Sequence, residues 1–165
     1  MDLGLISVCQ MQLADALSVI ERMRPQDLEC LHALRGFMSS EAFAVDRWST
    51  EGPAWVVMDG ALPVCIGGLT FHSEWLAVAW FIATPDMRPE SWRKVIRHSR
   101  TVFSKAADPS FEHYRHRIEA HVMADWPQAQ GFAKRLGFSF EGTRRGAGRC
   151  GEDFQTWAIV GPPKG

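Results

Sequence analysis

Apolar residues in the first part of the chain recur with the spacing of amphipathic helices. The apolar positions between 13 and 20 follow the i, i+3, i+4, i+7 pattern, which predicts a helix with one apolar stripe. A second helix is predicted to begin at Pro25, a favourable first helical residue, and to end at Gly36. A short third helix is predicted over 41–48, and the apolar run 3–8 predicts a strand before all of them.

The pattern then changes to that of strands. The apolar runs 55–58 and 62–71 are separated by Asp59-Gly60, which predicts a β-hairpin. Gly67-Gly68 inside the second run indicates a bulge or a close approach of another backbone. Residues 75–82 are almost continuously apolar, which predicts a central strand covered on both faces.

The rest of the chain alternates between helix and strand. Helices are predicted over 89–105 and 127–136, and strands over 117–123, 138–144 and 154–160. This order predicts a mixed α/β (α+β) fold with a mainly antiparallel sheet and one crossover helix between the central strands. We expect one domain over 1–160, followed by a flexible tail at 161–165. The predicted core residues are Trp80, Ile82, Ile118, Val122, Phe132, Leu136 and Phe138.

Composition narrows the function classes. A chain of 165 residues that is 46% hydrophobic has enough apolar residues for one sizeable core. Its net charge of −1 gives no electrostatic reason to expect nucleic acid as a partner, and its longest apolar run of nine residues is too short to cross a membrane. The N-terminus shows no signal-peptide pattern, so we expect a cytoplasmic protein. The four scattered cysteines are predicted to be reduced and mostly buried.

The C-terminal third carries a family resemblance. Ala129, Phe132 and the triplet Leu136-Gly137-Phe138 match the packing positions of a helix-exit signature of the GNAT superfamily of N-acetyltransferases. The predicted order of helices and strands is also similar to the GNAT fold over nearly the whole chain. The resemblance implies an acyl-CoA-dependent N-acyltransferase, with acetyl-CoA as the acyl donor and an amine on a small molecule or a protein as the acceptor.

The family's cofactor loop is altered in this sequence. Its pattern is close to Pro-x-x-Arg-Gly-x-Gly-x-Gly/Ala, and its N–H groups hold the CoA pyrophosphate. Here Pro85 and Arg88 are retained, Pro89 replaces the first glycine and has no N–H, and Ser91 replaces the second. Glu90 adds a negative charge. Arg88 and Ser91 remain the implied contacts of the cofactor, but a capped helix without a ligand explains the loop equally well. We therefore expect acetyl-CoA to bind more weakly than roughly 100 μM, or not at all.

The resemblance implies two further contacts with the cofactor. In the family the pantetheine arm pairs with the exposed backbone of the fourth strand, which corresponds here to Phe81, Ile82, Ala83 and Thr84. Trp126 stands where the family commonly has an asparagine that contacts the cofactor.

The acid and base of the reaction are less clearly indicated. Ala133 replaces the tyrosine that commonly protonates the departing thiolate, and an alanine has no proton to give. Tyr114, the only tyrosine, is either a substitute acid or a packing residue. The candidate bases for an amine acceptor are His72, Glu74, Glu119 and His121.

Other interpretations of the sequence remain. The histidines at 98, 113, 116 and 121 match no standard zinc spacing. The arginine-rich turn 144–149 is either a solvated hairpin tip or a partner-binding site. The segments 23–27 and 135–138 also resemble small GNAT-like proteins of tailed bacteriophages, some of them virion-associated. That likeness implies a non-catalytic alternative, a structural or assembly protein with protein partners, located in the infected cell or the virion.

Overall fold

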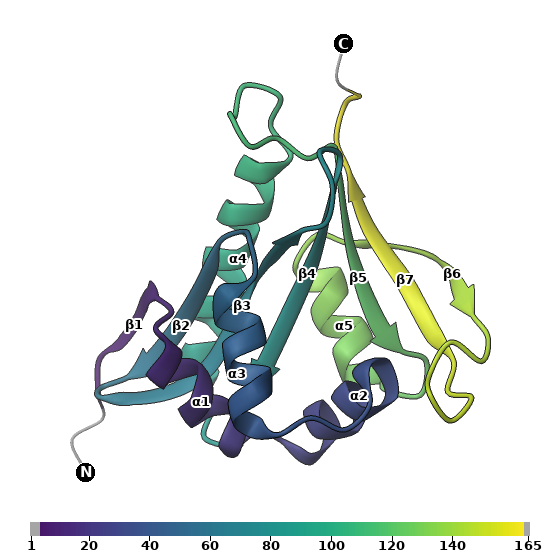
Figure 1. Ribbon diagram of the computed structural model, residues 1–165. Coiled ribbons are helices and arrows are strands. Elements are labelled where there is room, and N and C mark those ends of the chain that lie inside the picture. The colour runs from purple at the N-terminus through teal and green to yellow at the C-terminus, as the bar shows by residue number, and fades with distance from the viewer. Residues whose placement is uncertain (1–3, 164–165) are drawn as a thin grey trace.

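A computed structural model describes residues 4–163 as one seven-stranded sheet with five helices (Figure 1). The strands are β1 (Ile6–Gln10), β2 (Ala54–Asp59), β3 (Leu62–Phe71), β4 (Leu76–Ala83), β5 (Arg117–Met123), β6 (Ser139–Arg144) and β7 (Phe154–Val160). The helices are α1 (Leu13–Glu21), α2 (Pro25–Arg35), α3 (Ser40–Ser49), α4 (Pro89–Ala106) and α5 (Pro127–Arg135). The predicted mixed α/β fold is confirmed.

The sheet has the order β1-β2-β3-β4-β5-β7-β6. Every neighbouring pair is antiparallel except β4 and β5, which are parallel and joined by the crossover helix α4. These two strands pair only from Leu76–Arg117 to Val78–Glu119, although β4 continues to Ala83 and β5 to Met123. Figure 1 shows them diverging beyond that point. The centre of the sheet is therefore split at one end.

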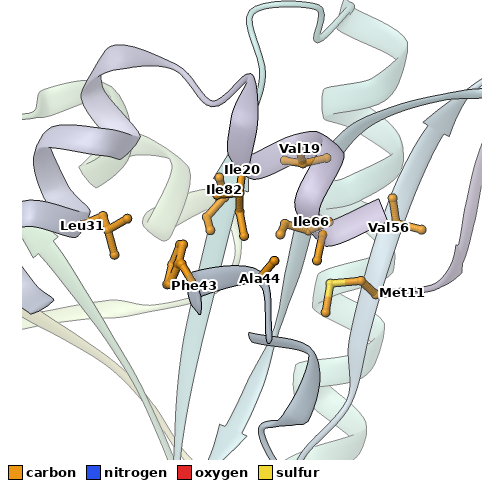
Figure 2. Packing of buried hydrophobic residues seen from close by; sticks show 10 residues of the cluster. Met11, Val19, Ile20, Leu31, Phe43, Ala44, Val56, Ile66 and Ile82 are labelled. Atoms are coloured by element: carbon orange, nitrogen blue, oxygen red, sulfur yellow. The ribbon is translucent and has the colours of Figure 1, made fainter. Parts of the chain in front are cut away.

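The helices form two layers. α1 and α3 cover one face of the sheet, where Phe43 and Ala44 of α3 pack with Ile66 and Ile82 (Figure 2). α4 and α5 cover the other face, where Phe103 of α4 shares a cluster with five of the predicted core residues and their neighbours. Helix α2 lies at the split end of the sheet, below α5 in Figure 1.

Five of the seven predicted core residues are buried, namely Ile82, Ile118, Val122, Leu136 and Phe138. Trp80 and Phe132 are only partly buried. The prediction that β4 is a central strand covered on both faces is confirmed, but its middle residues from Val78 to Phe81 are only half-buried. The reason is the split in the sheet, which leaves this part of β4 without a neighbouring strand on one side.

The two glycines of β3 let neighbouring groups come close to the backbone of this strand. The only register shift between β2 and β3 lies between Val57 and Met58, so the predicted bulge at the glycines is wrong. A Cβ on Gly68 would lie 2.6 Å from the carbonyl oxygen of Pro53 and 2.8 Å from the ring of Trp80. The close approach is confirmed, and it seats the indole of Trp80 against the sheet.

Several smaller predictions need correction. The first strand begins at Ile6 rather than at residue 3, which lies outside the described residues. Only Cys65 is a buried cysteine; Cys30 is partly buried, and the other two are exposed because they lie on the edge strand β1 and in the β6–β7 turn. In the tail, Gly161 donates a hydrogen bond to the His116 carbonyl at 2.7 Å, while residues 164–165 lie outside the described chain.

The arginine-rich turn is not a simple solvated tip. The N–H of Arg149 donates to the carbonyl of Ala33 at 2.8 Å, and its guanidinium lies 4.6 Å from the ring centroid of Phe37. The turn therefore packs against the C-terminal half of α2, while Arg144 and Arg145 remain exposed.

Candidate functional site

A cavity of about 800 Å³ opens where β4 and β5 separate. Its lining comes from both sides of the sheet, because successive side chains of a strand point to opposite faces. Val78, Trp80 and Ile82 face the layer of α1 and α3, whereas Ala79 and Phe81 face α4 and α5. The cavity therefore passes through the split in the sheet, and its volume lies in the range typical of small-molecule sites.

The main chain of β4 faces this cavity at Phe81. Thr84 donates its N–H to Val64 of β3 at 2.9 Å, and in an antiparallel pair every second residue points toward the same neighbour. The backbone groups of Thr84 and Ile82 therefore form hydrogen bonds with β3, while those of Phe81 and Ala83 point toward the gap. The predicted pantetheine contacts through the backbones of Ile82 and Thr84 are wrong for this reason.

Residues of helix α2 and its N-cap bind both hydrogen-bonding groups of the Ala83 main chain. The Ala83 carbonyl accepts the N–H of Arg24 at 2.9 Å, and the Ala83 N–H donates to Asp27 Oδ2 at 3.3 Å. Asp27 also binds Arg24 Nε at 2.7 Å. Burial raises the pKa of the Asp27 carboxyl, and Arg24 opposes that shift. Of the four predicted contacts on β4, only Phe81 has a main chain that is free for a ligand within the described part of the chain.

Aromatic rings fill the end of the gap beside α4 and α5. Phe81, Trp92 and Phe132 form a cluster with ring centroids 4.8–5.8 Å apart. The guanidinium of Arg24 lies 5.4 Å from the ring of Trp92 and 5.3 Å from that of Trp126. Trp126 thus lines the cavity, but its ring packs on a protein cation and anchors α2. Its contact with the cofactor stays a prediction.

The turn between β4 and α4 is closed by its own ion pairs. Arg88, the predicted pyrophosphate contact, binds both carboxylate oxygens of Asp59 at 2.6 and 2.9 Å and the carbonyl of Gly4 at 3.0 Å. The hydrogen bond with Asp59 raises the pKa of the guanidinium. Asp86 of the same turn binds Arg22 at 2.9 Å. Nε and Nη2 of Arg88 are thus already paired, whereas its Nη1 forms no hydrogen bond within the described chain and lies 3.9 Å from Glu90 Oε2. The pairing weakens the case for Arg88 as a phosphate contact, and that contact stays a prediction.

The side chain of Ser91 is not available to a ligand. Its side chain is completely buried, and its Oγ has no hydrogen-bond partner among the described residues. The hydroxyl of Ser91 is therefore not placed to contact the cofactor, and a contact through the rest of the residue stays a prediction. Pro89 is the first residue of α4 and has no N–H, and Trp92 already donates its N–H to Arg88. Glu90 and Ser91 thus supply the only unpaired amides in the first turn of this helix.

His121 is the predicted base that the structure places in the cavity. It lies on β5 two residues beyond the last β4–β5 pair, across the gap from Trp80. Its Nε2 is 3.5 Å from Glu119 Oε2, and its buried Nδ1 has no partner in the described chain. Burial lowers the pKa of His121, with the nearby arginines acting in the same direction and Glu119 against it. The imidazole is therefore mostly neutral at pH 7.

The other predicted acids and bases do not meet at the cavity. Glu119 is held by Arg117 at 2.6 Å and reaches the site only through His121. Tyr114 is buried beside Gly161 and does not line the cavity, which favours a packing role. His72 and Glu74 lie in the β3–β4 turn, at the paired end of β4 and away from the split.

Four arginines that the sequence analysis did not select also line the cavity, namely Arg24, Arg35, Arg47 and Arg135. Arg47 of α3 and Arg35 of α2 share one carboxylate, Asp46, at 2.8 and 3.0 Å. A signal for Arg47 was present in the sequence: it follows Phe43 by four residues and therefore shares the apolar face of the helix. Burial lowers the pKa of the Arg47 guanidinium, while Asp46 opposes that shift.

Neither a metal site nor a membrane span is evident in residues 4–163. No group of three or more histidine, cysteine or acidic side chains is placed to hold a metal ion. The helices of this region are all too short or too polar to cross a bilayer.

Comparison with solved structures identifies the fold. The ribosomal-protein-S18-alanine N-acetyltransferase of Escherichia coli matches with a TM-score of 0.68 and 15% identity over 98% of this chain and 97% of its own. A GNAT-family acetyltransferase of Streptococcus pneumoniae has a TM-score of 0.69 and 11% identity, covering 96% and 100%. The yncA protein of Salmonella typhimurium, solved with its cofactor acetyl-CoA, has a TM-score of 0.68 and 11% identity, covering 94% and 93%.

These likenesses show that the chain has the fold of the GNAT acetyltransferases. No family model matches the sequence, and no curated protein matches it. The predicted fold resemblance is confirmed, whereas the resemblance to bacteriophage proteins stays a prediction.

Proposed function

We propose that this protein is an N-acyltransferase that transfers an acyl group from a thioester to an amine inside the cavity between β4 and β5. The observation that carries the proposal is the main chain of Phe81, which lines the cavity and which no strand of the described chain uses. An extended thioester arm can pair with such a strand edge as an added strand does. The same fold in yncA was solved with acetyl-CoA, which supports this choice of donor class.

The chain's own groups supply the chemistry in this proposal. The N–H of Phe81 donates to the thioester carbonyl oxygen as negative charge develops there. His121, neutral at pH 7, accepts the proton that the amine nitrogen loses as it attacks the carbonyl carbon. The C–N bond forms and the C–S bond breaks. The departing thiolate takes a proton from water, since Ala133 has none, and His121 returns its own proton to solvent.

The cavity fits the thioester end of acetyl-CoA better than its nucleotide end. Apolar walls and a free strand edge suit the acyl group and the pantetheine arm. The β4–α4 turn does not suit the pyrophosphate, because Arg88 is held by Asp59 and the first helical residue is a proline. We therefore propose that the nucleotide contributes little to binding.

Calorimetry with two thioesters tests the proposal. One is acetyl-CoA, and the other is S-acetyl-N-acetylcysteamine, which copies the end of the pantetheine arm and lacks the nucleotide. We expect both to bind, with dissociation constants within about tenfold of each other. Binding of neither thioester would overturn the acyltransferase proposal. Much tighter binding of acetyl-CoA would overturn the argument about the β4–α4 turn.

A matched pair of variants tests the role of the Phe81 main chain. Phe81→Pro and Phe81→Leu both remove the ring, but only proline removes the N–H. Proline is tolerable here because this N–H belongs to no ladder of the described sheet. We expect Phe81→Pro to lose thioester binding and acyl transfer, and Phe81→Leu to retain both. Equal behaviour of the two folded variants would exclude the N–H from the mechanism.

A second function is favoured by the surface of the α2–α3 segment. Five large apolar side chains of this segment are exposed, namely Leu28, Leu34, Phe37, Val45 and Trp48. Exposed apolar residues at this density suit a protein partner, as in a non-catalytic assembly protein. Size-exclusion chromatography with light scattering tests self-assembly through this surface. A monomer that transfers acyl groups would favour the enzyme.

A further inference from the structure

The α2–α3 side of the cavity has an excess of positive charge. Arg35 and Arg47 both line it, and Asp46 is the one carboxylate that both contact. Arg24 and Asp27, at the other end of α2, neutralise each other. Two guanidinium groups that share one carboxylate leave about one positive charge without a counter-ion at the wall of a partly apolar cavity, where an uncompensated charge is costly.

Arg47 is the better placed of the two to contact a ligand. Its side chain is 10% exposed, so little water compensates its charge. Its Nε and Nη2 donate to Asp46 at 3.1 and 2.8 Å, and within the described chain no hydrogen bond uses its Nη1. Its guanidinium lies 5.2 Å from the ring centroid of Trp80, which forms part of the cavity wall. The side chain that carries this free donor therefore lines the cavity and is largely shielded from bulk solvent.

We propose that the acceptor is a hydrophobic amino acid whose carboxylate binds Arg47, with Arg35 adding to the attraction. A carboxylate is the anion that matches a planar guanidinium in both charge and geometry. The surrounding wall is apolar, with Leu31, Phe43 and Trp80 as its main contributors on this side.

The position of Trp80 links this anchor to the candidate base. Trp80 contacts Arg47 on one side and lies across the gap from His121 on the other. In this proposal the carboxylate binds at Arg47 and the amine lies inside the cavity that Trp80 and His121 also line. The inference rests on the proposed function for the fate of that amine, but the carboxylate anchor is testable without any thioester.

Calorimetry with matched acids and amides tests the anchor. The probes are L-leucine, L-phenylalanine and L-tryptophan, each compared with its own amide, which keeps the amine and the side chain and removes the negative charge. We expect at least one free acid to bind about tenfold more tightly than its amide. Arg47→Gln should abolish that preference, and Arg35→Gln, which changes a more exposed partner, should reduce it.

Arg93→Gln is the control, since it removes the same charge from an exposed position on α4 outside the cavity. It should leave the preference unchanged. Equal affinity for acids and amides, or no binding of any probe, would overturn the inference, and so would an unchanged preference in Arg35→Gln and folded Arg47→Gln. Acid preference without any thioester binding would support the anchor and overturn the acyltransferase proposal. Thioester binding without acid preference would support the acyltransferase proposal and overturn the carboxylate anchor.

Discussion

The β4–α4 turn and the gap between β4 and β5 adjoin the same strand, yet they differ in how far their polar groups have partners within the protein. In the turn, Arg88 is bound by Asp59 and Asp86 is bound by Arg22, so that the amides of Glu90 and Ser91 and one guanidinium nitrogen of Arg88 are what remains unpaired. In the gap, the main chain of Phe81, Nδ1 of His121 and Nη1 of Arg47 have no partner within the described chain.

The difference indicates where a ligand can bind with net gain. A polar group that is already paired gives up one interaction to form another, so the exchange contributes little free energy. A buried group without a partner gains the whole interaction. The turn, which the family resemblance marks as the cofactor site, is therefore the weaker site in this chain, and the gap is the stronger.

The largest expected effect comes from adding a methyl group at Gly68, behind the Trp80 ring that forms part of the cavity wall. Gly68→Ala places a methyl group against the Pro53 carbonyl and the ring of Trp80, which should cost about 3 kcal/mol of the free energy of unfolding or displace Trp80 into the cavity. Gly131→Ala on α5 is the control, because a Cβ there meets nothing within 4 Å and should stabilise the helix by about 0.5–1 kcal/mol. Urea unfolding measures both, and equal stability would contradict the described packing.

Separating α2 from β4 should have the next largest effect. Asp27→Ala leaves the Arg24 guanidinium and the Ala83 N–H without their acceptor, which should cost about 2 kcal/mol in urea unfolding. Glu29→Ala, an exposed change on the same helix, should stay within about 0.5 kcal/mol of the wild type. If Asp27→Ala lowered the free energy of unfolding as little as Glu29→Ala does, α2 would not be fixed to the strand through this carboxylate.

Restoring the cofactor turn should have a moderate effect on affinity. Pro89→Gly returns one N–H to the first turn of α4, and we expect calorimetry to show acetyl-CoA binding up to about tenfold more tightly. Ser91→Gly should give no gain, because this side chain is completely buried and blocks nothing. The opposite ranking of the two variants would show that the phosphate path runs past Ser91.

The smallest effect concerns the pH dependence of stability. Burial holds the pKa of His121 below its usual value, so the unfolded chain takes up this proton first as the pH falls. The stability that His121 contributes is present above about pH 6.5 and is lost as the pH falls through its lower, folded pKa. His121→Asn should flatten that decline by less than about 1 kcal/mol in urea unfolding between about pH 7.5 and 5. An unchanged profile would assign the decline to other groups, such as His98.

The sequence predicted what depends on neighbouring residues and failed where distant segments meet. Periodicity placed β5 and β7 at their observed bounds, because alternation and turn residues are local signals. It placed Trp80 and Phe132 in the core because both are apolar, whereas the split in the sheet, a long-range feature, exposes them to the cavity. The partner of Arg88 lies 29 residues away, so the closure of the turn had no local signal.

The contact of α2 with Ala83 has a consequence for the motion of the sheet. Phe81 and Ala83 both point their amides away from β3, but only the amide of Ala83 has an acceptor, which belongs to a helix and not to a strand. Hydrogen exchange at Ala83 therefore reports the detachment of α2, whereas exchange at Phe81 reports access of water to the gap. As long as α2 holds the end of β4 and packs against β5 and β7 through Ala33, the two strands are kept apart at a fixed width. The exchange rate of the Ala83 amide, compared with that of the Phe81 amide, would therefore measure how often α2 detaches and the spacing of the two strands changes.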